Sequence, residues 1–409
     1  MVLAKVWFLV VWCCVLWGGH QISATNTSCP SAFLNRCSCG MAYSPYDGHR
    51  QMKYTVNCTN SGFRTASMLH SLPEETEVFI FTGNTIPTLP INMFNKTLFY
   101  NDLDVIDMSN NHIRFIQGKT FHRVYRVKTL ILNHNDLDIT DKKERPRLFS
   151  SFDSLEHLHL TNAFSEKINS SDYLLSLEDI FYESTLDLLK TLHLEQNEIW
   201  TIGNNTGVFC QLPKLQDLFL TDNRLRDFDF RIDCLHSLRN INLERNMIAR
   251  LSDDAMRALD NFNRDNSTVT IRMQQNNFDC DCRSKNFIQW LNTTKVNIEG
   301  WSDLKCVDGY PSTNIGKTLS EVQELPCSSH SKLGRMGAVG HGSHPHGYSS
   351  STIGALSFLL VFTTSMLLAV LYFHKEKAKK LFTPYWDFIT RKIGYTGLSH
   401  DEAPQEVNV

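Results

Sequence analysis

The chain has 409 residues, of which 42% are hydrophobic, and this is enough for one large domain or two ordinary ones. Its 40 Lys and Arg against 43 Asp and Glu leave a formal net charge of -3, so the charge balance gives no reason to invoke nucleic acid as a partner.

An apolar run near the N-terminus, Val6 to Trp17, follows Lys5 and ends in small and polar residues up to Ala24. This order of charge, apolar run and small residues is typical of a secretory signal peptide, so residues 1–24 are expected to be removed. A retained signal-anchor helix is the alternative, and the run is short for crossing a bilayer.

Residues 25–70 hold the first cysteine cluster, which comprises Cys29, Cys37, Cys39 and Cys58. Residues 71–278 then repeat one pattern: apolar, two residues, apolar, one residue, apolar, two residues, Asn, one residue, apolar. Complete copies are Leu103-Ile106-Met108-Asn111-Ile113, Val127-Leu130-Leu132-Asn135-Leu137, Leu189-Leu192-Leu194-Asn197-Ile199, Leu215-Leu218-Leu220-Asn223-Leu225 and Leu238-Ile241-Leu243-Asn246-Ile248. Partial copies lie at Phe79-Phe81-Asn84-Ile86 and Ile271-Met273-Asn276-Phe278, and a degenerate one at Leu155-Leu158-Leu160 has Ala163 in place of Asn.

These about eight copies resemble leucine-rich repeats. Apolar residues two apart lie on one face of a short strand, and the Asn can hydrogen-bond backbone groups where the chain turns. Amphipathic helices do not fit, because the apolar period is two. The fold class expected is α/β: a leucine-rich repeat solenoid with a curved parallel β-sheet, an irregular or short-helical convex side, disulfide caps at both ends and one transmembrane helix.

The array has one irregular stretch, residues 163–188, where a polar insertion follows the repeat that lacks its Asn. The insertion is expected to be a loop or short helix on the convex or lateral side. Two sub-arrays would meet imperfectly there.

Cys210 and Cys234 precede consecutive repeats. Adjacent turns of a solenoid stack roughly 5 Å apart at their strands, which makes a disulfide between them geometrically plausible. Two separate buried thiols are the alternative.

Residues 279–328 hold the last cysteine cluster, Cys280, Cys282, Cys306 and Cys327, around an aromatic, helix-like run. The two clusters resemble the cysteine-rich flanks of extracellular leucine-rich repeat proteins. That resemblance implies the pairs Cys29–Cys39, Cys37–Cys58, Cys280–Cys306 and Cys282–Cys327, whereas spacing alone leaves three pairings for each cluster. A zinc site would need reduced thiolates, which an extracellular setting disfavours.

Residues 329–352 are rich in Gly and Ser and are expected to form a flexible stalk. Its histidines, His341, His344 and His346, have no fixed geometry that would support a metal site.

The next segment, residues 353–373, is an uncharged apolar run of 21 residues, about 30 Å long as a helix and so able to span a bilayer. Four lysines follow it between Lys375 and Lys380, and residues 336–352 contain no Lys or Arg. By the positive-inside rule the N-terminal part lies outside, which predicts a type I single-pass protein of the plasma membrane.

The cytoplasmic tail would be residues 374–409. Its end, Val407-Asn408-Val409, fits capture of a terminal carboxylate by a PDZ domain. Tyr395 and Leu398 fit the tyrosine-x-x-apolar pattern of endocytic sorting signals. The alternative is a disordered tail whose lysines lie on anionic lipid.

Seven glycosylation sequons precede the membrane run and indicate a glycosylated ectodomain. They start at Asn26, Asn57, Asn95, Asn169, Asn204, Asn266 and Asn292. Asn57 is the weakest candidate, because the middle residue of its sequon is Cys58.

The pattern contains no nucleophile motif, phosphate loop or metal-hydrolase signature, so we expect no enzyme activity and no cofactor. The repeats offer a binding surface instead. Outward strand positions, one from each of seven successive repeats, are Asp107, Ile131, His159, His193, Phe219, Asn242 and Arg272, with His157, Asp217, Glu195 and Glu244 beside them. Ile131 and Phe219 are expected to be exposed apolar side chains, which mark contact sites in some proteins and are harmless when single in others.

His157, His159 and His193 are expected to cluster. Solvated side chains, a pH-sensitive contact and a metal site remain open interpretations. The order of segments resembles that of the leucine-rich repeat transmembrane family of adhesion molecules and signalling modulators. The resemblance implies a receptor or adhesion protein for an extracellular protein ligand or co-receptor, or alternatively a modulator of another receptor pathway, of the Wnt type.

Overall fold

The computed structural model describes residues 29–327, apart from 47–49, 141–147, 185, 204–206, 263–267, 323–324 and 326. The expected signal peptide, stalk, membrane helix and cytoplasmic tail lie outside the described residues, as do Asn26, Asn204 and Asn266. The part that is described contains no helix with the length and apolarity needed to cross a membrane.

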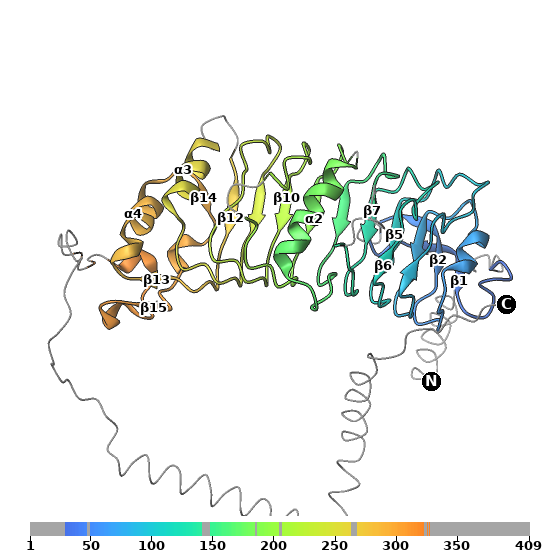
Figure 1. The fold of residues 1–409 in the computed structure, drawn as a ribbon, viewed down its shortest axis with the longest axis horizontal. Coiled ribbons are helices and arrows are strands. Elements are labelled where there is room, and N and C mark those ends of the chain that lie inside the picture. The colour runs from blue at the N-terminus through green and yellow to red at the C-terminus, as the bar shows by residue number, and fades with distance from the viewer. Residues whose placement is uncertain are drawn as a thin grey trace, which may run out of the picture. The chain divides into compact units, whose positions relative to one another are not determined.

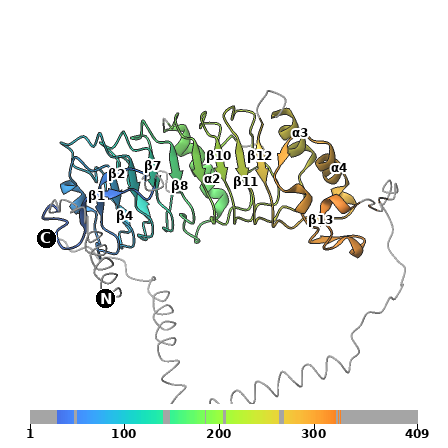
Figure 2. The same ribbon diagram turned by 180° about the vertical axis from the view of Figure 1, so that it is seen from behind.

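One 11-stranded sheet runs through the described region (Figures 1 and 2). In spatial order its strands are β1 (Ser38–Tyr43), β2 (Met52–Asn57), β3 (Val78–Ile80), β5 (Val105–Asp107), β7 (Thr129–Ile131), β8 (His157–His159), β9 (Thr191–His193), β10 (Asp217–Phe219), β11 (Asn240–Asn242), β12 (Thr270–Arg272) and β14 (Asn297–Ile298). Strands β1 and β2 pair antiparallel, and the later neighbours pair parallel. The predicted parallel-sheet solenoid is confirmed.

Each repeat strand is only three residues long because a single side chain per strand enters the core. In β9 the middle residue, Leu192, is fully buried, while Thr191 and His193 on either side are half-buried. Alternation along a strand sends neighbouring side chains to opposite faces. The core is continuous from Phe33 in the N-terminal flank to Val322 near the C-terminal end, and each fully buried leucine contributes roughly 1.5–3 kcal/mol.

The repeat asparagines form a buried ladder that joins successive turns. Asn223 is representative: its Nδ2 donates to the carbonyl oxygens of Leu194 at 2.9 Å and Leu220 at 3.0 Å. Its Oδ1 accepts the backbone N–H groups of Asn197 at 3.0 Å and Ile199 at 3.1 Å. One amide side chain thus satisfies backbone groups that leave the strand ladder at the turn, which is why the pattern requires Asn at this position.

The residue before each ladder position adopts a left-handed conformation, which aims the following side chain into the core. Asn110, His134, Asn162, Gln196, Asp222, Arg245 and Gln275 all have positive φ. At the first repeat this residue is Gly83, with φ +69°, where an added Cβ would lie 2.0 Å from the Asn60 Oδ1 atom. A larger residue at that turn would have to displace the Asn60 side chain, whereas glycine adopts the positive φ without that change.

The insertion contains helix α2 (Ser170–Tyr182) and does not interrupt the sheet. Its buried residues, Tyr173, Leu174, Leu177, Ile180 and Phe181, follow a helical period. Strands β8 and β9 pair in register across it, His159 opposite His193. The expected imperfect junction is therefore wrong for the sheet. The repeats meet imperfectly only in the asparagine ladder. There Ala163 replaces the Asn, and Leu137 and Phe164 form a bridge beside it.

Five disulfides join the ten cysteines of the described region. They link Cys29–Cys39, Cys37–Cys58, Cys210–Cys234, Cys280–Cys306 and Cys282–Cys327. Four of these pairs match those implied by the resemblance. The Cys210–Cys234 bridge, with Cα atoms 5.4 Å apart, joins two successive turns.

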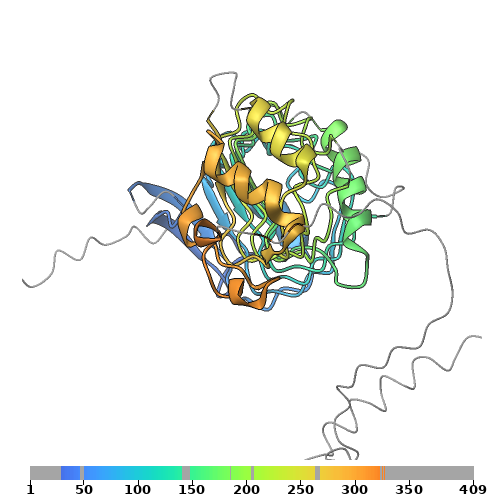
Figure 3. The same cartoon turned by 90° about the vertical axis from the view of Figure 1, so that its left-hand side faces the viewer.

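Two helices cover the C-terminal end of the core, α3 (Asp253–Phe262) and α4 (Lys285–Thr293). The Trp290 Nε1 atom of α4 donates to Asp260 of α3 at 2.9 Å, and Phe278 stacks against Phe287. Viewed end-on in Figure 3, α2 lies on the opposite side of the repeats from the β1–β2 hairpin.

Remaining short elements complete the turns and flanks. They are β4 (Thr88–Leu89) paired with β6 (Phe115–Ile116), β13 (Asp279–Cys280) paired with β15 (Asp308–Gly309), and the 3-10 turns Ser67–Ser71, Cys282–Ser284, Trp301–Asp303, Ser312–Asn314 and Leu319–Glu321.

Candidate functional site

Register aligns the seven candidate contact residues in a single row across the sheet, which we call the sheet-face column. The row consists of Asp107, Ile131, His159, His193, Phe219, Asn242 and Arg272. Each is the third residue of its strand, so parallel pairing in equal register brings them together.

Three aromatic rings of the column stack face to face. The centroids of His159 and His193 are 4.2 Å apart with an interplanar angle of 10°. Those of His193 and Phe219 are 4.4 Å apart at 5°. We call these three side chains the ring stack; it presents ring edges to solvent along three successive turns. His157 is not part of it, because its register partner in β9 is Thr191.

A carboxylate orients the middle ring. His193 Nδ1 donates to Glu195 Oε1 at 2.8 Å, and the Thr161 hydroxyl donates to the other carboxylate oxygen at 2.8 Å. Burial raises the pKa of Glu195, but the hydrogen bond and charge of His193, together with the hydrogen bond from Thr161 and a backbone hydrogen bond, outweigh burial and hold the pKa of this carboxyl below its usual range. Glu195 therefore holds His193 in the stack as a charged acceptor.

The His159 imidazole is neutral at physiological pH. Burial, followed by repulsion from the neighbouring His193 and His157, lowers its pKa to about 3. The same desolvation lowers the pKa of His157. A pH-sensitive contact in this column would therefore respond to acid well below neutrality.

Acid should destabilise the repeats through His159, and replacing it with phenylalanine should reduce that sensitivity. The pKa of His159 is about 3 when folded against an ordinary 6.5, so its contribution to stability is complete above pH 6.5 and is lost as pH falls towards 3. Melting temperatures measured between pH 7 and pH 4 should fall less for His159→Phe than for the parent chain. The exposed His236, changed to Phe in the same way, serves as the control. Identical acid sensitivity of all three proteins would contradict this account.

The N-terminal third of the sheet face is already occupied by the chain itself. The Tyr46 hydroxyl, from the loop after β1, donates to Asp107 Oδ2 at 2.6 Å, and burial followed by the Asp107 charge raises the pKa of this tyrosine. Val105 beside it is 5% exposed and Ile131 only 8%. The expectation that Ile131 is an exposed contact residue is therefore wrong, because an outward strand position does not by itself keep a side chain exposed.

Beyond the ring stack the column becomes polar. The Asn242 Oδ1 atom accepts the backbone N–H of Glu244 at 2.9 Å, and Arg272 Nε lies 2.8 Å from Glu299 Oε2. Phe219 is half-buried. His159 and Arg272 thus mark the two ends of an accessible strip of the column, with Phe219 between them.

A row of ion pairs crosses the sheet at the residues that directly precede strands β5, β7, β8 and β9, and it begins at Lys53 in β2. Lys53 and Lys128 lie 2.6 Å and 2.9 Å from the Asp104 carboxylate, and Lys190 lies 2.5 Å from Glu156. Although burial opposes it, hydrogen bonds from both lysines keep the pKa of Asp104 below its usual range. Sequence reasoning missed this row; opposite charges at equal repeat positions are the signal that could have found it.

The sequons in the described region lie mostly away from the column. Asn95, Asn169 and Asn292 are outside the sheet, Asn292 being exposed on α4. Asn57 is the exception, since it pairs in register with Ile80 at the N-terminal edge. Glycans at Asn95, Asn169 and Asn292 would therefore be attached outside the sheet.

The histidines of the column do not assemble a metal site. No group of three or more His, Cys, Asp or Glu side chains within the described ranges is arranged to hold a metal ion.

Comparison with known proteins agrees with the repeat architecture. The family model described as "Leucine rich repeat" matches residues 187–248. The crystal structure of human trophoblast glycoprotein, also named Wnt-activated inhibitory factor 1, superimposes with a TM-score of 0.57 at 23% identity and covers 74% of this chain and 100% of that one. This chain has the leucine-rich repeat fold.

Curated proteins that are similar to this chain include human Toll-like receptor 5, which is 27% identical over 267 residues, 65% of this chain and 28% of the receptor. Trophoblast glycoprotein of Macaca fascicularis is 23% identical over 286 residues, 67% of this chain and 64% of that protein. Mouse CD180 antigen is 26% identical over 329 residues, 79% of this chain and 42% of the antigen. The chain thus spans less than two thirds of the length of these relatives.

Proposed function

We propose that this leucine-rich repeat protein is a type I, single-pass cell-surface glycoprotein that binds an extracellular protein ligand or co-receptor through its sheet face. The observation that carries the proposal is the ring stack, an aromatic strip held rigid by Glu195 on the sheet face. Rigid aromatic side chains next to arginine are the commonest energetic centres of protein interfaces.

The relatives support a binding role. They are named as Toll-like receptors, as CD180 antigen and as trophoblast glycoprotein, a group of cell-surface proteins. The accessible part of the proposed contact surface is narrower than the repeat pattern alone suggests, because Tyr46 already engages Asp107. We therefore place the contact between His159 and Arg272.

The double change Phe219→Ala and Arg272→Glu should abolish contact with the partner and leave surface display unchanged. Loss of one interface centre costs about 2 kcal/mol, roughly a 30-fold rise in Kd. Proximity labelling on intact cells, with the parent chain and the variant at equal surface level, should show a set of extracellular neighbours that the variant loses.

The matched control is Ile91→Ala with Arg257→Glu, which removes an exposed apolar residue and reverses an exposed arginine outside the sheet. It should keep the same neighbours. If the sheet-face variant also keeps them, the contact lies elsewhere on the repeats.

A second candidate is modulation of another receptor pathway through the membrane-proximal parts. Two names among the similar proteins favour this class: Wnt-activated inhibitory factor 1 for human trophoblast glycoprotein, and Transforming growth factor beta activator LRRC33 for a zebrafish relative. Full activity of an ectodomain held on the membrane by a lipid anchor would exclude it, because the PDZ and sorting motifs would then be dispensable.

A further inference from the structure

Helix α2 carries apolar side chains on the face that points away from the core. Leu175 is 59% exposed and Tyr182 is 75% exposed, and Leu188, just after the helix, is 45% exposed. Single exposed apolar residues are common, but three within fourteen residues, on a helix whose other face is fully packed, form a patch. The folding of the repeats does not require these side chains to be apolar.

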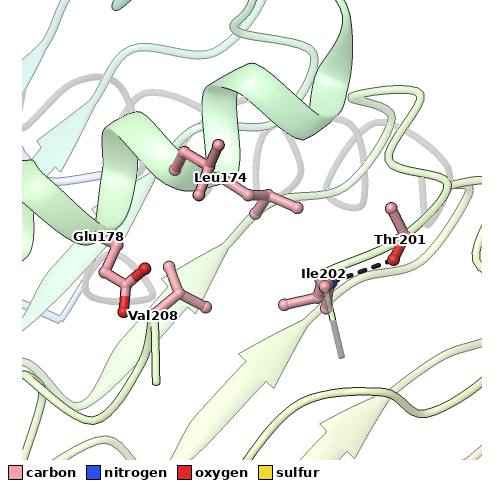
Figure 4. A pocket seen from close by; sticks show the side chains of 7 residues that line it. Leu174, Glu178, Thr201, Ile202 and Val208 are labelled. Carbon is pink, nitrogen blue, oxygen red and sulfur yellow. Dashed lines mark hydrogen bonds between the residues drawn. The ribbon is translucent and has the colours of Figure 1, made fainter. Parts of the chain in front are cut away.

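A small apolar pocket adjoins this patch (Figure 4). Leu174 and Leu175 of α2 form one wall, and Ile202 and Val208 of the next turn form the other. Its volume is about 160 Å³, close to the roughly 150 Å³ of an apolar cavity that accepts one benzene ring. The pocket therefore has room for a single large apolar side chain.

The surroundings of the pocket are acidic. Glu178 lines it, with Leu174 one turn earlier on the helix. The sequence from 168 to 189 contains five acidic residues and no Lys or Arg: Asp172, Glu178, Asp179, Glu183 and Asp187. A cationic partner would be attracted here, and an anionic one would be repelled.

We propose that the outer face of α2 and its pocket form a second docking surface, which binds a cationic amphipathic segment of a partner protein. One apolar side chain of that segment enters the pocket between Leu175 and Val208. Its Lys and Arg residues face the carboxylates of α2. This surface is distinct from the sheet face, because α2 lies across the repeats from the β1–β2 hairpin (Figure 3).

The probe for the test is a synthetic amphipathic peptide with lysines on one side and one phenylalanine between leucines on the other. The full-length protein is held in phosphatidylcholine nanodiscs, and empty nanodiscs give the blank. Fluorescence anisotropy should show saturable binding of this peptide. Replacing the apolar residues of the peptide with serine, or its lysines with glutamate, should weaken binding at least tenfold.

Two variants of the protein separate the apolar contribution to peptide binding from the electrostatic one. Leu175→Ser removes the apolar wall, Glu178→Gln removes only the charge, and each should weaken peptide binding at least tenfold. The control Ile91→Ser removes an equally exposed apolar residue away from α2 and should leave binding unchanged. Equal binding by all proteins, or no binding above the blank, overturns the proposal.

Self-association is the competing outcome for this surface. The mass of the nanodisc particles, measured with and without Leu175→Ser, distinguishes it. A dimer that this substitution converts to a monomer, without peptide binding, would assign the surface to a second copy of the chain and overturn the proposal. The sheet-face variant Phe219→Ala with Arg272→Glu should bind the peptide normally. Failure of the α2 docking surface can therefore be distinguished from failure of the proposed sheet-face function.

Discussion

Replacing Asn197 with alanine should lower the free energy of unfolding of the repeats by about 2–4 kcal/mol. The buried Asn197 side chain accepts the backbone N–H groups of Ala163 at 3.0 Å and Phe164 at 3.3 Å and donates to the carbonyl oxygen of Leu160 at 2.8 Å. Its loss leaves these buried groups without a partner, and each costs about 1–3 kcal/mol unless the turn relaxes.

Asn197 should be the most sensitive position of the ladder, because the turn before it already lacks an asparagine. At Ala163 no ladder amide is present, so Asn197 is the ladder side chain that accepts the backbone N–H groups of this turn, beside the Leu137–Phe164 bridge. Urea denaturation measures the global effect, and hydrogen exchange at the Ala163 and Phe164 amides measures the local one. Asn242→Ala removes an amide from the sheet face and should change stability little. Unaltered protection at residues 163 and 164 would show that the turn does not depend on the ladder.

Changing Cys280 and Cys306 together to serine should have an effect of similar size at the C-terminal end. The bridge closes a loop with a sequence separation of 26, for which the chain-entropy model gives about 3–4 kcal/mol. Both cysteines are buried against the end of the core. The C-terminal flank should therefore open and expose Phe278 and Phe287 beneath it, and much of the protein should be retained inside the cell.

The comparison variant is Cys210→Ser with Cys234→Ser, whose sequence separation of 24 is nearly equal. Chain entropy predicts that the two variants lose similar amounts of free energy of unfolding. In the second variant, however, the affected turns still pair with neighbouring strands of the sheet on both sides. Hydrogen exchange should rise at Phe278 and Phe287 only when Cys280 and Cys306 are changed. Peptide mapping without reduction should first recover the native pairs from the parent protein. Free thiols at Cys280 and Cys306 in secreted parent protein would refute the premise.

The repeat strands and their register were predictable because both follow from local pattern. Leu192, Leu218 and Ile241 recur at fixed distances from an asparagine, and a strand with one buried side chain admits one register. The same regularity located the sheet-face column by residue number, including His159, His193 and Phe219. No periodicity governs what lies over that column.

For that reason the repeat pattern wrongly predicted that Ile131 is exposed. It also did not predict the hydrogen bond from Tyr46 to Asp107. The Tyr46 contact depends on how a flank loop folds back over a strand that is 61 residues away in the sequence. Helix α2 was expected only as a loop or a short helix, because its apolar residues serve both the core and the exposed patch and blur the helical pattern. The stacking of His159 on His193 follows from the register, but the ring spacing does not.

The bridge between Cys210 and Cys234 also changes how the repeats would respond to mechanical tension. In a solenoid pulled from its ends, the hydrogen bonds between turns lie along the direction of force and break one turn at a time. A freed stretch of 24 residues would lengthen the chain by about 80 Å at roughly 3.4 Å per residue. The disulfide prevents the chain between Cys210 and Cys234 from extending by that length. Tension that reaches Cys234 would pass through the bridge to Cys210, so the residues between them, including Phe219 of the ring stack, would not be extended.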